Sequence, residues 1–438
     1  MGIMGRRGIA AMVVAAALLA TGCSGQDDSG QQQQAAGPAS LTFWTWAPNM
    51  DKVVALWNQQ NPDIKVTVNK QDGGDPAVTK LLTATKAGSG APDVMQAEYQ
   101  KIPTLVAADA LADISKNLDP SVAKAFPEAV WNSVSLGSDA VYAVPQDTGP
   151  MVFYYREDVF KSLGLQAPKT WADYAAAARK VHQSDPKKYL GTFSAADAGW
   201  FSGLAQQAGA SWWGVNGQSW SVDIDSDATR KVADFWGGLV EEGVIGNKPM
   251  YTPAWNAGLN NGTQVGWVSA VWGPGVLEAN AAKTVGKWKM APLPQWDAAK
   301  EATGNWGGSA TAVTSQSKHQ AQAAKFSAWL NTDPEAVKAL AQISGVYPAA
   351  TAGQTEALTS PPKFFANQPD FYQTVAKAAT TVAPFTYGPN VNVAYNTYND
   401  AFGKAADAKK KSAFLTALTT MQASTVKDLT DSGFTVAK

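Results

Sequence analysis

Short apolar segments alternate with amphipathic segments between residues 41 and 98. The apolar segments have the length and the β-branched and aromatic content of buried strands, and the segments between them repeat apolar residues at helical spacing. The predicted order is strand 41–46, helix 50–60, strand 64–69, helix 77–86 and strand 93–98. This alternation predicts a parallel sheet whose strands are connected by helices, so the predicted fold class is α/β.

Three residues with ligand-binding chemistry stand at the ends of these strands. In parallel sheets with helical crossovers, ligands bind beyond the carboxyl ends of the strands. Trp46 ends the first predicted strand, and Glu98 and Tyr99 stand at the end of the third. The sequence therefore places these three residues at an expected ligand-binding edge.

The middle and the end of the chain predict further elements. Residues 141–155 predict two strands, separated at residues 147–150 by a segment, DTGP, with the composition of a turn. Thr170 is placed to cap a helix over residues 171–182. Apolar residues at helical spacing over residues 406–429 predict one long helix near the C-terminus.

The segment DIDSD at residues 223–227 has aspartates at alternate positions, as in a calcium-binding loop. However, the sixth position of such a loop is Ala228 here, where the sharp turn requires glycine, and the twelfth is Asp234 in place of glutamate. The alternative is that Ser226 or Asp227 caps a helix. We therefore expect a capped helix and no metal site.

The N-terminal residues have the pattern of a secretion signal. Two arginines precede an apolar run over residues 9–20, which is shorter than the roughly 20 residues that cross a bilayer as a helix. The segment Ala-Thr-Gly-Cys ending at Cys23 resembles the lipobox of bacterial lipoproteins, although leucine is more usual than Ala20 at its position. The resemblance implies removal of residues 1–22 and lipidation of Cys23. Alternatively, Cys23 belongs to a signal peptide that is cut further downstream.

Composition narrows the function class. The formal net charge is −1 and there is no basic block, which argues against a nucleic-acid partner. The chain has 17 tryptophans but only 16% charged residues, as expected for a neutral, polar ligand with ring-shaped faces. Cys23 is the only cysteine, so no internal disulfide can form. Residues 24–40 are rich in Gln, Gly and Ser and predict a flexible tether. The rest of the chain is longer than the roughly 250–300 residues that one hydrophobic core organises, so two lobes are expected.

Four stretches, in their order and spacing, resemble the family-1 extracellular solute-binding proteins, the family that includes maltose-binding protein. They are VPQDTGPMVFYYREDVFKSLGL at 144–165, PKTWADYAAAARKV at 168–181, NNGTQVGWVSAVWGPGVL at 260–277, and NWGGSATAV through GVYPA at 305–349. The resemblance covers nearly all of the chain after the signal. It implies a periplasmic-binding-protein-like fold of type II, in which a hinge joins two α/β lobes with a ligand cleft between them.

The resemblance also implies how the chain is divided. The expected parts are a signal peptide (1–22), a tether (23–40), an N-terminal lobe (41–149 with 309–360) and a C-terminal lobe (150–308 with 361–438). The chain is expected to cross between the lobes near residues 148–150 and 306–309. Small residues there allow the backbone rotation that a hinge needs.

A sugar presents weakly apolar C–H faces and hydroxyls that both donate and accept hydrogen bonds. Its site needs aromatic rings and polar groups but no cofactor. Trp272 matches the family's sugar-stacking tryptophan, the alternative being a core tryptophan. Asp147 is a candidate acceptor for hydroxyls or, alternatively, an Asx-turn residue that supports Gly149. The full set of candidate ligand-binding residues is Trp46, Glu98, Tyr99, Asp147, Trp200, Trp272, Trp306, Gly307, Gly308 and Tyr347.

The resemblance implies an extracytoplasmic lipoprotein that captures a mono- or oligosaccharide and delivers it to the permease subunits of an ABC importer, as a monomer. A secreted enzyme is an alternative because paired carboxylates can hydrolyse sugars, but the sequence lacks the G-x-S-x-G and H-E-x-x-H motifs. A protein of the same fold that binds a peptide or polyamine is a further alternative. The carboxylates of Glu98 and Asp147 would also suit a cationic ligand, so that alternative stays open.

Overall fold

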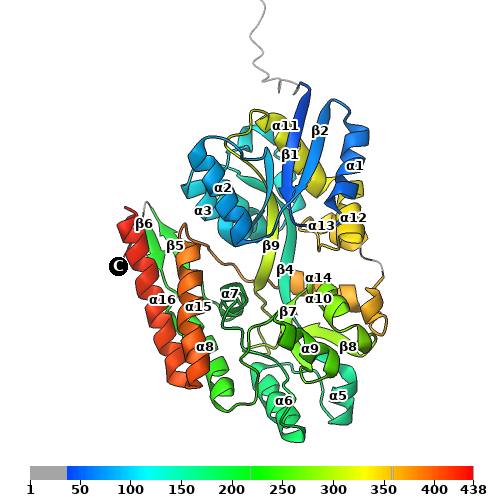
Figure 1. The fold of residues 1–438 in the computed structure, drawn as a ribbon, viewed down its shortest axis with the longest axis vertical. Coiled ribbons are helices and arrows are strands. Elements are labelled where there is room, and N and C mark those ends of the chain that lie inside the picture. The colour runs from blue at the N-terminus through cyan, green and yellow to red at the C-terminus, as the bar shows by residue number, and fades with distance from the viewer. Residues whose placement is uncertain (1–36, 218, 357, 359, 438) are drawn as a thin grey trace, which may run out of the picture. The chain divides into compact units, whose positions relative to one another are not determined.

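The computed structural model describes residues 37–437, except residues 218, 357 and 359 (Figure 1). The expected signal peptide, Cys23 and nearly all of the expected tether lie outside the described residues. None of the described helices is both long enough and apolar enough to cross a membrane.

The first part of the described chain alternates strands and helices. Its elements are β1 (Ala39–Thr45), α1 (Met50–Gln60), β2 (Ile64–Lys70), α2 (Asp75–Ala87), β3 (Val94–Glu98), η1 (Tyr99–Lys101), α3 (Ile102–Ala107), η2 (Ser115–Asn117), η3 (Val122–Ala125), α4 (Glu128–Ser135) and β4 (Ala143–Arg156). The five elements predicted between residues 41 and 98 are confirmed, and each boundary lies within two residues of the prediction.

The remaining elements are mostly helical. In the middle of the chain they are α5 (Glu157–Ser162), α6 (Trp171–Ser184), α7 (Ala198–Gln207), β5 (Trp213–Asn216), β6 (Ser219–Val222), α8 (Asp227–Glu241), α9 (Pro253–Asn261), β7 (Gly266–Ala270), α10 (Gly273–Asn280), η4 (Ala282–Thr284), β8 (Trp288–Pro292) and β9 (Asn305–Val313). They are followed by α11 (Gln320–Thr332), α12 (Pro334–Ala339), η5 (Leu340–Ser344), α13 (Thr351–Glu356), η6 (Lys363–Phe365), α14 (Phe371–Thr380), α15 (Val391–Ala408) and α16 (Lys411–Asp431).

One mixed sheet runs through the described molecule in the order β2-β1-β3-β9-β4-β7, and β8 also pairs with β4. β1, β2 and β3 are parallel, whereas β9 is antiparallel to both β3 and β4. The first half of β4 pairs with β9 and its second half pairs with β7 and β8. Figure 1 shows β4 and β9 side by side between the upper group of elements, which includes β1, β2 and α11, and the lower group, which includes α5, α6 and α9.

The prediction of two strands separated by a turn at residues 147–150 is wrong. The structure has a single strand of 14 residues, β4, in this region. Its pairing with β9 shifts register between Pro145 and Asp147 and again between Thr148 and Pro150. Proline cannot donate to a strand ladder and glycine weakens it, so the two irregularities accommodate the residues that gave the segment its turn-like composition.

Two separate hydrophobic cores flank the region where β4 and β9 pair. Phe326 of α11 lies in the first core, where its ring packs edge to face on Phe43 of β1 at 5.6 Å and on Trp57 of α1 at 5.4 Å. β4 contributes Val144 to this first core and Met151 to the second, which is built largely from the helices of the middle and end of the chain. The α/β fold of two lobes connected by shared strands follows from this arrangement.

Local capping explains several helix boundaries. Thr170 caps α6 as predicted, and Asp173 completes a capping box with it. Ser226 caps α8 by accepting a hydrogen bond from the backbone N–H of Thr229. The Asp225 carboxylate pairs with Arg230 at 2.6 Å.

The single long helix predicted over residues 406–429 is wrong. The chain forms two helices, α15 and α16, that are separated at Lys409 and Lys410. Lys409 adopts a left-handed conformation with φ 51°, which ends α15.

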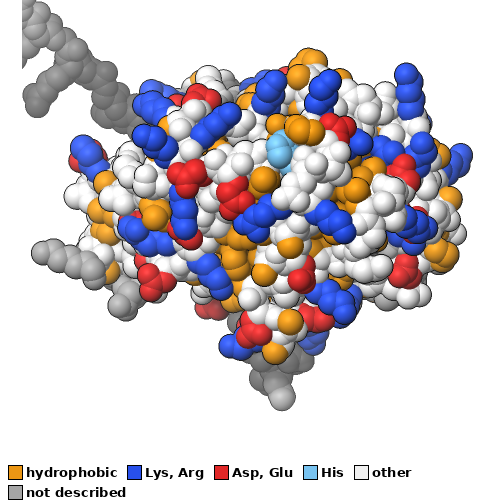
Figure 2. Space-filling view, turned by 90° about the horizontal axis from the view of Figure 1, so that it is seen from below, with side chains coloured by type: hydrophobic (Ala, Val, Ile, Leu, Met, Phe, Trp, Pro, Cys, Tyr) orange, Lys and Arg blue, Asp and Glu red, His pale blue; other side chains and the backbone are white. Residues whose placement is uncertain are grey.

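On the face drawn in Figure 2, Lys and Arg side chains are interspersed with Asp and Glu, in keeping with a net charge near zero.

Candidate functional site

A cavity of about 550 Å³ lies beside the segment where β4 pairs with β9, and both lobes contribute to its walls. Eight of the ten predicted site residues line this cavity: Trp46, Glu98, Asp147, Trp272, Trp306, Gly307, Gly308 and Tyr347. They come from the ends of β1 and β3, from the paired strands, from the start of α10 and from the segment after η5. The sequence thus brings together residues that are up to 301 positions apart.

Two indole rings form one wall of the cavity and fix each other's position. Trp272, which follows β7, is half-buried, and its Nε1–H donates to the carbonyl oxygen of Trp306 at 2.8 Å. The two rings meet edge to face, with 4.7 Å between their centroids and an interplanar angle of 66°. The Nε1–H of Trp306 in turn donates to Oδ1 of Asp197 at 3.2 Å. The partners of both indole N–H groups therefore lie within the protein, and the half-buried ring of Trp272 is the more exposed of the two.

Trp46 contributes a third indole, held by the loop that follows β1. The backbone of Gly73 lies close to this ring, and a Cβ atom added there would come within 3.1 Å of it, a tight contact. The backbone N–H groups of Trp46 and Ala47 both donate to Oε1 of Gln96 at 3.2 Å. Gln96 of β3 was not predicted as a site residue, because its position in a buried strand gives no sign of this role.

Asp147 is held at the center of the paired strands by hydrogen bonds across them. Its Oδ1 accepts from the backbone N–H of Ser309 at 2.6 Å and from the Ser309 hydroxyl at 3.1 Å. The same hydroxyl accepts from Nε2 of Gln96 at 2.9 Å. Burial raises the pKa of the Asp147 carboxyl to about 6, although the hydrogen bonds from Ser309 act in the opposite direction.

Tyr99 does not line this cavity, which corrects its predicted position. Its ring is buried, and its hydroxyl donates to the carbonyl oxygen of Asp147 at 2.8 Å. Glu98 ends β3 and lines this cavity, whereas Tyr99 begins η1 and lines a second, smaller cavity. Tyr99 therefore supports the backbone of the site from behind.

Trp200 also lies away from the cavity, and its predicted ligand role is wrong. Its side chain is 0% exposed, and its Nε1–H donates to the carbonyl oxygen of Val268 at 3.1 Å. The ring packs edge to face on Trp236 in the second core, with 4.9 Å between centroids. Asp197 precedes α7 as its cap and has a non-helical backbone, and it, rather than Trp200, lines the cavity.

Asp197 is the most informative residue that the sequence analysis missed. It caps α7 by accepting from the backbone N–H of Trp200 at 2.9 Å, and it lines the cavity next to Trp306. Burial raises the pKa of its carboxyl to about 6. The segment DAGW identifies Asp197 as a candidate helix cap, but the sequence does not show that this cap faces the cavity.

Tyr251 and Ser344 also line the cavity, although neither was predicted as a site residue. Tyr251 is 42% exposed and has a left-handed backbone (φ 66°), and its ring lies 6.3 Å from that of Trp306. The hydroxyls of Ser344 and Tyr347 are buried at the cavity and have no hydrogen-bond partner in the described part of the chain. A buried hydroxyl without a partner is costly, so both atoms are placed to bond a ligand or water.

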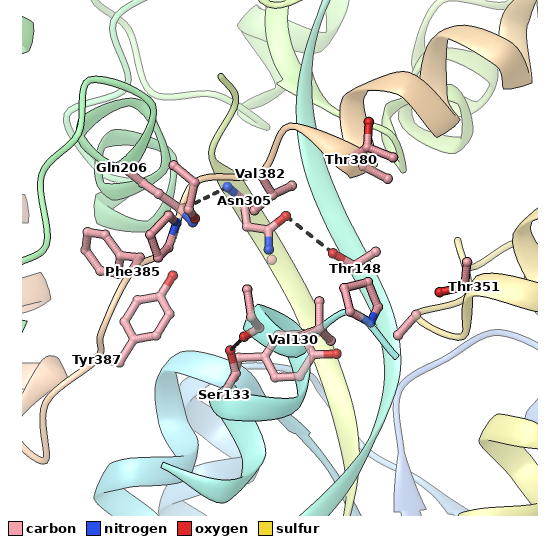
Figure 3. Close-up of a pocket in the computed structure, with 18 of the residues that line it drawn as sticks. Val130, Ser133, Thr148, Gln206, Asn305, Thr351, Thr380, Val382, Phe385 and Tyr387 are labelled. Carbon is pink, nitrogen blue, oxygen red and sulfur yellow. Dashed lines mark hydrogen bonds between the residues drawn. The ribbon is translucent and has the colours of Figure 1, made fainter. Parts of the chain in front are cut away.

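A second cavity, of about 350 Å³, also lies beside the paired strands and shares Thr148 and Gly307 with the first (Figure 3). Asn305 lines it, whereas the next residue of β9, Trp306, lines the first cavity. In Figure 3, Asn305 receives a hydrogen bond from the Thr148 hydroxyl at 3.3 Å and donates its backbone N–H to Gln206 at 2.7 Å. No Asp, Glu, Lys or Arg is among the residues that line this second cavity. The indoles and carboxylates that suit a polar, ring-shaped ligand are therefore at the first cavity.

Comparisons with known proteins identify the family of this chain. Over residues 44–425 the sequence matches the family of bacterial extracellular solute-binding proteins. It is 26% identical over 325 residues to the arabinooligosaccharide-binding protein of Halalkalibacterium halodurans, covering 71% of this chain and 72% of that protein. It is 26% identical over 412 residues to the lactose-binding protein of Rhizobium radiobacter, covering 87% of this chain and 89% of that protein.

Solved structures share the fold over almost the whole chain. The galacto-N-biose-/lacto-N-biose I-binding protein of the ABC transporter from Bifidobacterium longum, in complex with lacto-N-biose, superposes with a TM-score of 0.82 at 30% identity, covering 92% of this chain and 100% of that one. The ABC transporter associated binding protein from B. animalis subsp. lactis, in complex with β-1,6-galactobiose, gives a TM-score of 0.78 at 25% identity. The match covers 92% of this chain and 100% of that one. This chain belongs to the bacterial extracellular solute-binding protein family.

Proposed function

We propose that this protein binds a neutral carbohydrate in the 550 Å³ cavity and delivers it, unaltered, to the permease subunits of an ABC importer. The observation that carries the proposal is the lining of that cavity: three indoles from both lobes, together with the carboxylates of Asp147 and Asp197. Rings cover the apolar faces of a sugar, and carboxylates accept hydrogen bonds from its hydroxyls. Binding of this kind needs no cofactor.

The relatives support the same ligand class. The similar proteins named above bind arabinooligosaccharides, lactose, lacto-N-biose or β-1,6-galactobiose. Those ligands are all carbohydrates, and two of the proteins are described as parts of ABC transporters. We infer that this chain serves the same step of sugar uptake, as a monomer.

The proposed lobes are residues 41–149 with 309–360 and residues 150–308 with 361–438. Two observations support this division: the two separate cores, and the passage of β4 from the first core at Val144 to the second at Met151. Rotation of one lobe against the other about β4 and β9 would close the cavity on a bound sugar.

A cationic ligand such as a polyamine is the second candidate. Glu98, Asp147 and Asp197 all line the cavity, and several carboxylates among aromatic rings also suit a cation. Burial raises the pKa of the Asp147 and Asp197 carboxyls to about 6, so both are mostly ionised at neutral pH, and the titration below distinguishes a sugar from a cation.

Calorimetric titration of residues 37–438 tests the proposal. We expect saturable binding of at least one of lactose, lacto-N-biose, β-1,6-galactobiose and arabino-oligosaccharides, with no polyamine binding. Chromatography of the same mixtures after prolonged incubation should recover the sugar intact. Binding of spermidine without any sugar would select the cationic alternative, and a released hydrolysis product would select the enzyme.

Attachment to the membrane through a lipid on Cys23 is the proposed anchor, which places the protein on the outer face of the cell membrane. Cys23 is the only cysteine and follows a segment that resembles a lipobox. We expect the full-length protein expressed in a bacterial host to incorporate labelled palmitate and sediment with membranes. The Cys23→Ser variant should lose both properties, and a variant that still incorporates label would contradict this assignment.

A further inference from the structure

The second cavity, of about 350 Å³, has walls from both proposed lobes. Helix α4 and Thr351 contribute from one lobe, and residues 379–387, at the end of α14 and just after it, contribute from the other. In Figure 3 the rings of Phe385 and Tyr387 lie on one side of the space and Thr351 lies on the opposite side. A molecule that fills this cavity therefore contacts both lobes.

Direct hydrogen bonds between the lobes lie next to this cavity along the chain. The hydroxyl of Thr104 in α3 donates to the carbonyl oxygen of Pro389 at 2.7 Å, and the ammonium of Lys101 donates to Oδ1 of Asn392. Lys101 and Pro389 each follow a cavity-lining tyrosine by two residues. The width of the cavity thus depends on how the two lobes are oriented.

The lining suits an uncharged molecule that carries a ring. None of the described residues that line this cavity is an Asp, Glu, Lys or Arg. Phe385 and Tyr387 are half-buried, and their ring centroids are 4.9 Å apart. Val130 and Val382 add aliphatic surface. An ion would lose its hydration here without gaining a partner of opposite charge, whereas an apolar ring would gain contacts.

Asn305 supplies a hydrogen-bond donor for the polar end of such a molecule. Its Oδ1 accepts from the Thr148 hydroxyl at 3.3 Å, which leaves the amide Nδ2 as the free end of the side chain. Nδ2 donates to no other described residue, and Figure 3 shows it pointing into the cavity. A carbonyl or hydroxyl oxygen of a ligand can accept from it.

We propose that the second cavity binds a small, uncharged molecule with a ring and a hydrogen-bond acceptor, and that this ligand weakens sugar binding at the first cavity. The effect on the sugar rests on the proposed function. Thr148 and Gly307 line both cavities, so a rotation about β4 and β9 that closes the first changes the walls of the second. A ligand that fits the second cavity in the present arrangement opposes that rotation, and the coupling is reciprocal.

Benzamide, benzoate and benzamidine test the class of ligand, because they have nearly the same shape but are neutral, anionic and cationic. Each is titrated into residues 37–438 without sugar, and binding is followed by ligand-observed nuclear magnetic resonance. We expect saturable binding of benzamide, with an affinity at least about tenfold higher than that of either ion. Absence of saturable benzamide binding, or equal affinity for all three probes, would overturn the proposal.

Three variants locate the probe. Ala379→Phe, at a half-buried alanine of α14 that lines the cavity, should abolish benzamide binding. Ala376→Phe, at a half-buried alanine of the same helix that lines neither cavity, should keep it. Asn305→Asp keeps the acceptor for Thr148 but replaces the donor by a negative charge, so benzamidine should become the preferred probe. Benzamide that still binds to Ala379→Phe protein with wild-type circular dichroism occupies another place and contradicts the proposal.

The coupling is measured with a sugar that binds in the titration described above. Saturating benzamide should raise the Kd for that sugar at least about fivefold to a plateau, and the sugar should raise the Kd for benzamide by the same factor. An unchanged Kd, or an increase without a plateau, which indicates direct competition, would overturn the proposed effect. If no sugar binds, the proposed function and the coupling are both wrong, while the benzamide titration still decides whether the second site exists.

Discussion

The indole of Trp272 is held at its edge, so that its face remains available to a ligand. Its N–H donates to the carbonyl oxygen of Trp306, and its ring stands against that of Trp306. Trp272→Ala removes the ring that covers the apolar face of the sugar. We expect it to weaken sugar binding by about 1–3 kcal/mol, or about 5- to 150-fold in Kd, as measured by calorimetry.

Trp131→Ala is the matched control for this change. Trp131 is also half-buried but stacks on Phe126 and does not line the cavity. Both variants should keep the wild-type far-ultraviolet circular dichroism. Trp272→Ala protein that binds the sugar with wild-type affinity would exclude this ring from the site.

The buried carboxyls of Asp147 and Asp197 predict opposite pH trends for stability and for binding. Each has a pKa of about 6 in the folded protein, above its ordinary value of 3.8. Folding therefore takes up protons between about pH 4 and 6, and the stability contributed by these groups decreases as the pH rises through that window. Sugar hydroxyls donate to the ionised carboxylates, so affinity should decrease as the pH falls through 6.

We expect the Kd for the sugar to rise about tenfold between pH 7.5 and pH 5, as measured by calorimetry. Over the same range the free energy of unfolding that these groups contribute to the ligand-free protein, measured by urea denaturation, should increase as the pH falls. The double variant Asp147→Asn, Asp197→Asn keeps oxygen acceptors for Ser309, Trp200 and Trp306 but cannot titrate. Its affinity should be nearly independent of pH. An unchanged pH profile in the double variant would show that other groups control it.

The sequence predicted most of the cavity wall because strand ends and the family resemblance point to particular positions. Trp46, Asp147 and Trp272 line the cavity for that reason. The position of Trp200 was predicted incorrectly because the sequence does not show which residue at the start of a helix faces the cavity. Tyr251 could not have been found at all, since its position depends on a left-handed backbone in a loop without a pattern.

Among the secondary-structure elements, the paired strands β4 and β9 depend on two adjacent glycines. Gly307 and Gly308 have φ values of 78° and 94°, which side chains rarely allow. A Cβ atom at position 308 would also lie 2.9 Å from the ring of Tyr99, whose hydroxyl holds the Asp147 backbone. We expect Gly308→Ala to lower the free energy of unfolding by about 1–3 kcal/mol, measured by urea denaturation.

Gly403→Ala provides the contrasting substitution. Gly403 lies inside α15, and a Cβ atom there has no neighbour within 4 Å. Alanine favours the helix by about 0.5–1 kcal/mol, so this variant should be at least as stable as the wild type. Equal stability of Gly308→Ala and the wild type would mean that the strand pairing relaxes around the new methyl group without cost.

The elements that sequence analysis misjudged share a cause. Composition at residues 147–150 predicts a turn, but pairing with β9 on one side keeps the segment extended as part of β4. Helical periodicity continues through residues 406–429, but Lys409 turns the chain back so that α16 packs along α15 and α8. In both places contacts with distant parts of the chain override a local preference, whereas α1 and α6 follow their local patterns and caps.

For the whole molecule, the presence of two cores predicts two cooperative unfolding units. β4 and β9 connect the units, and the proposed sugar contacts both, through Trp46 on one side and Trp272 on the other. Such a ligand binds only while both lobes are folded. We therefore expect calorimetric heating of the ligand-free protein to give two overlapping transitions, one for each lobe.

A sugar that bridges the lobes has a distinctive effect on those transitions. At a concentration about 100 times its Kd it stabilises the doubly folded state by about 2.7 kcal/mol, so the lower transition should move upward. The upper transition occurs after the sugar has left and should stay in place, until the two transitions merge at higher sugar concentration. A sugar held by one lobe alone would instead move only the transition of that lobe, even when it is the upper one. Trp46→Ala and Trp272→Ala, on different lobes, should both reduce the shift of the lower transition, because each removes part of the same bridge.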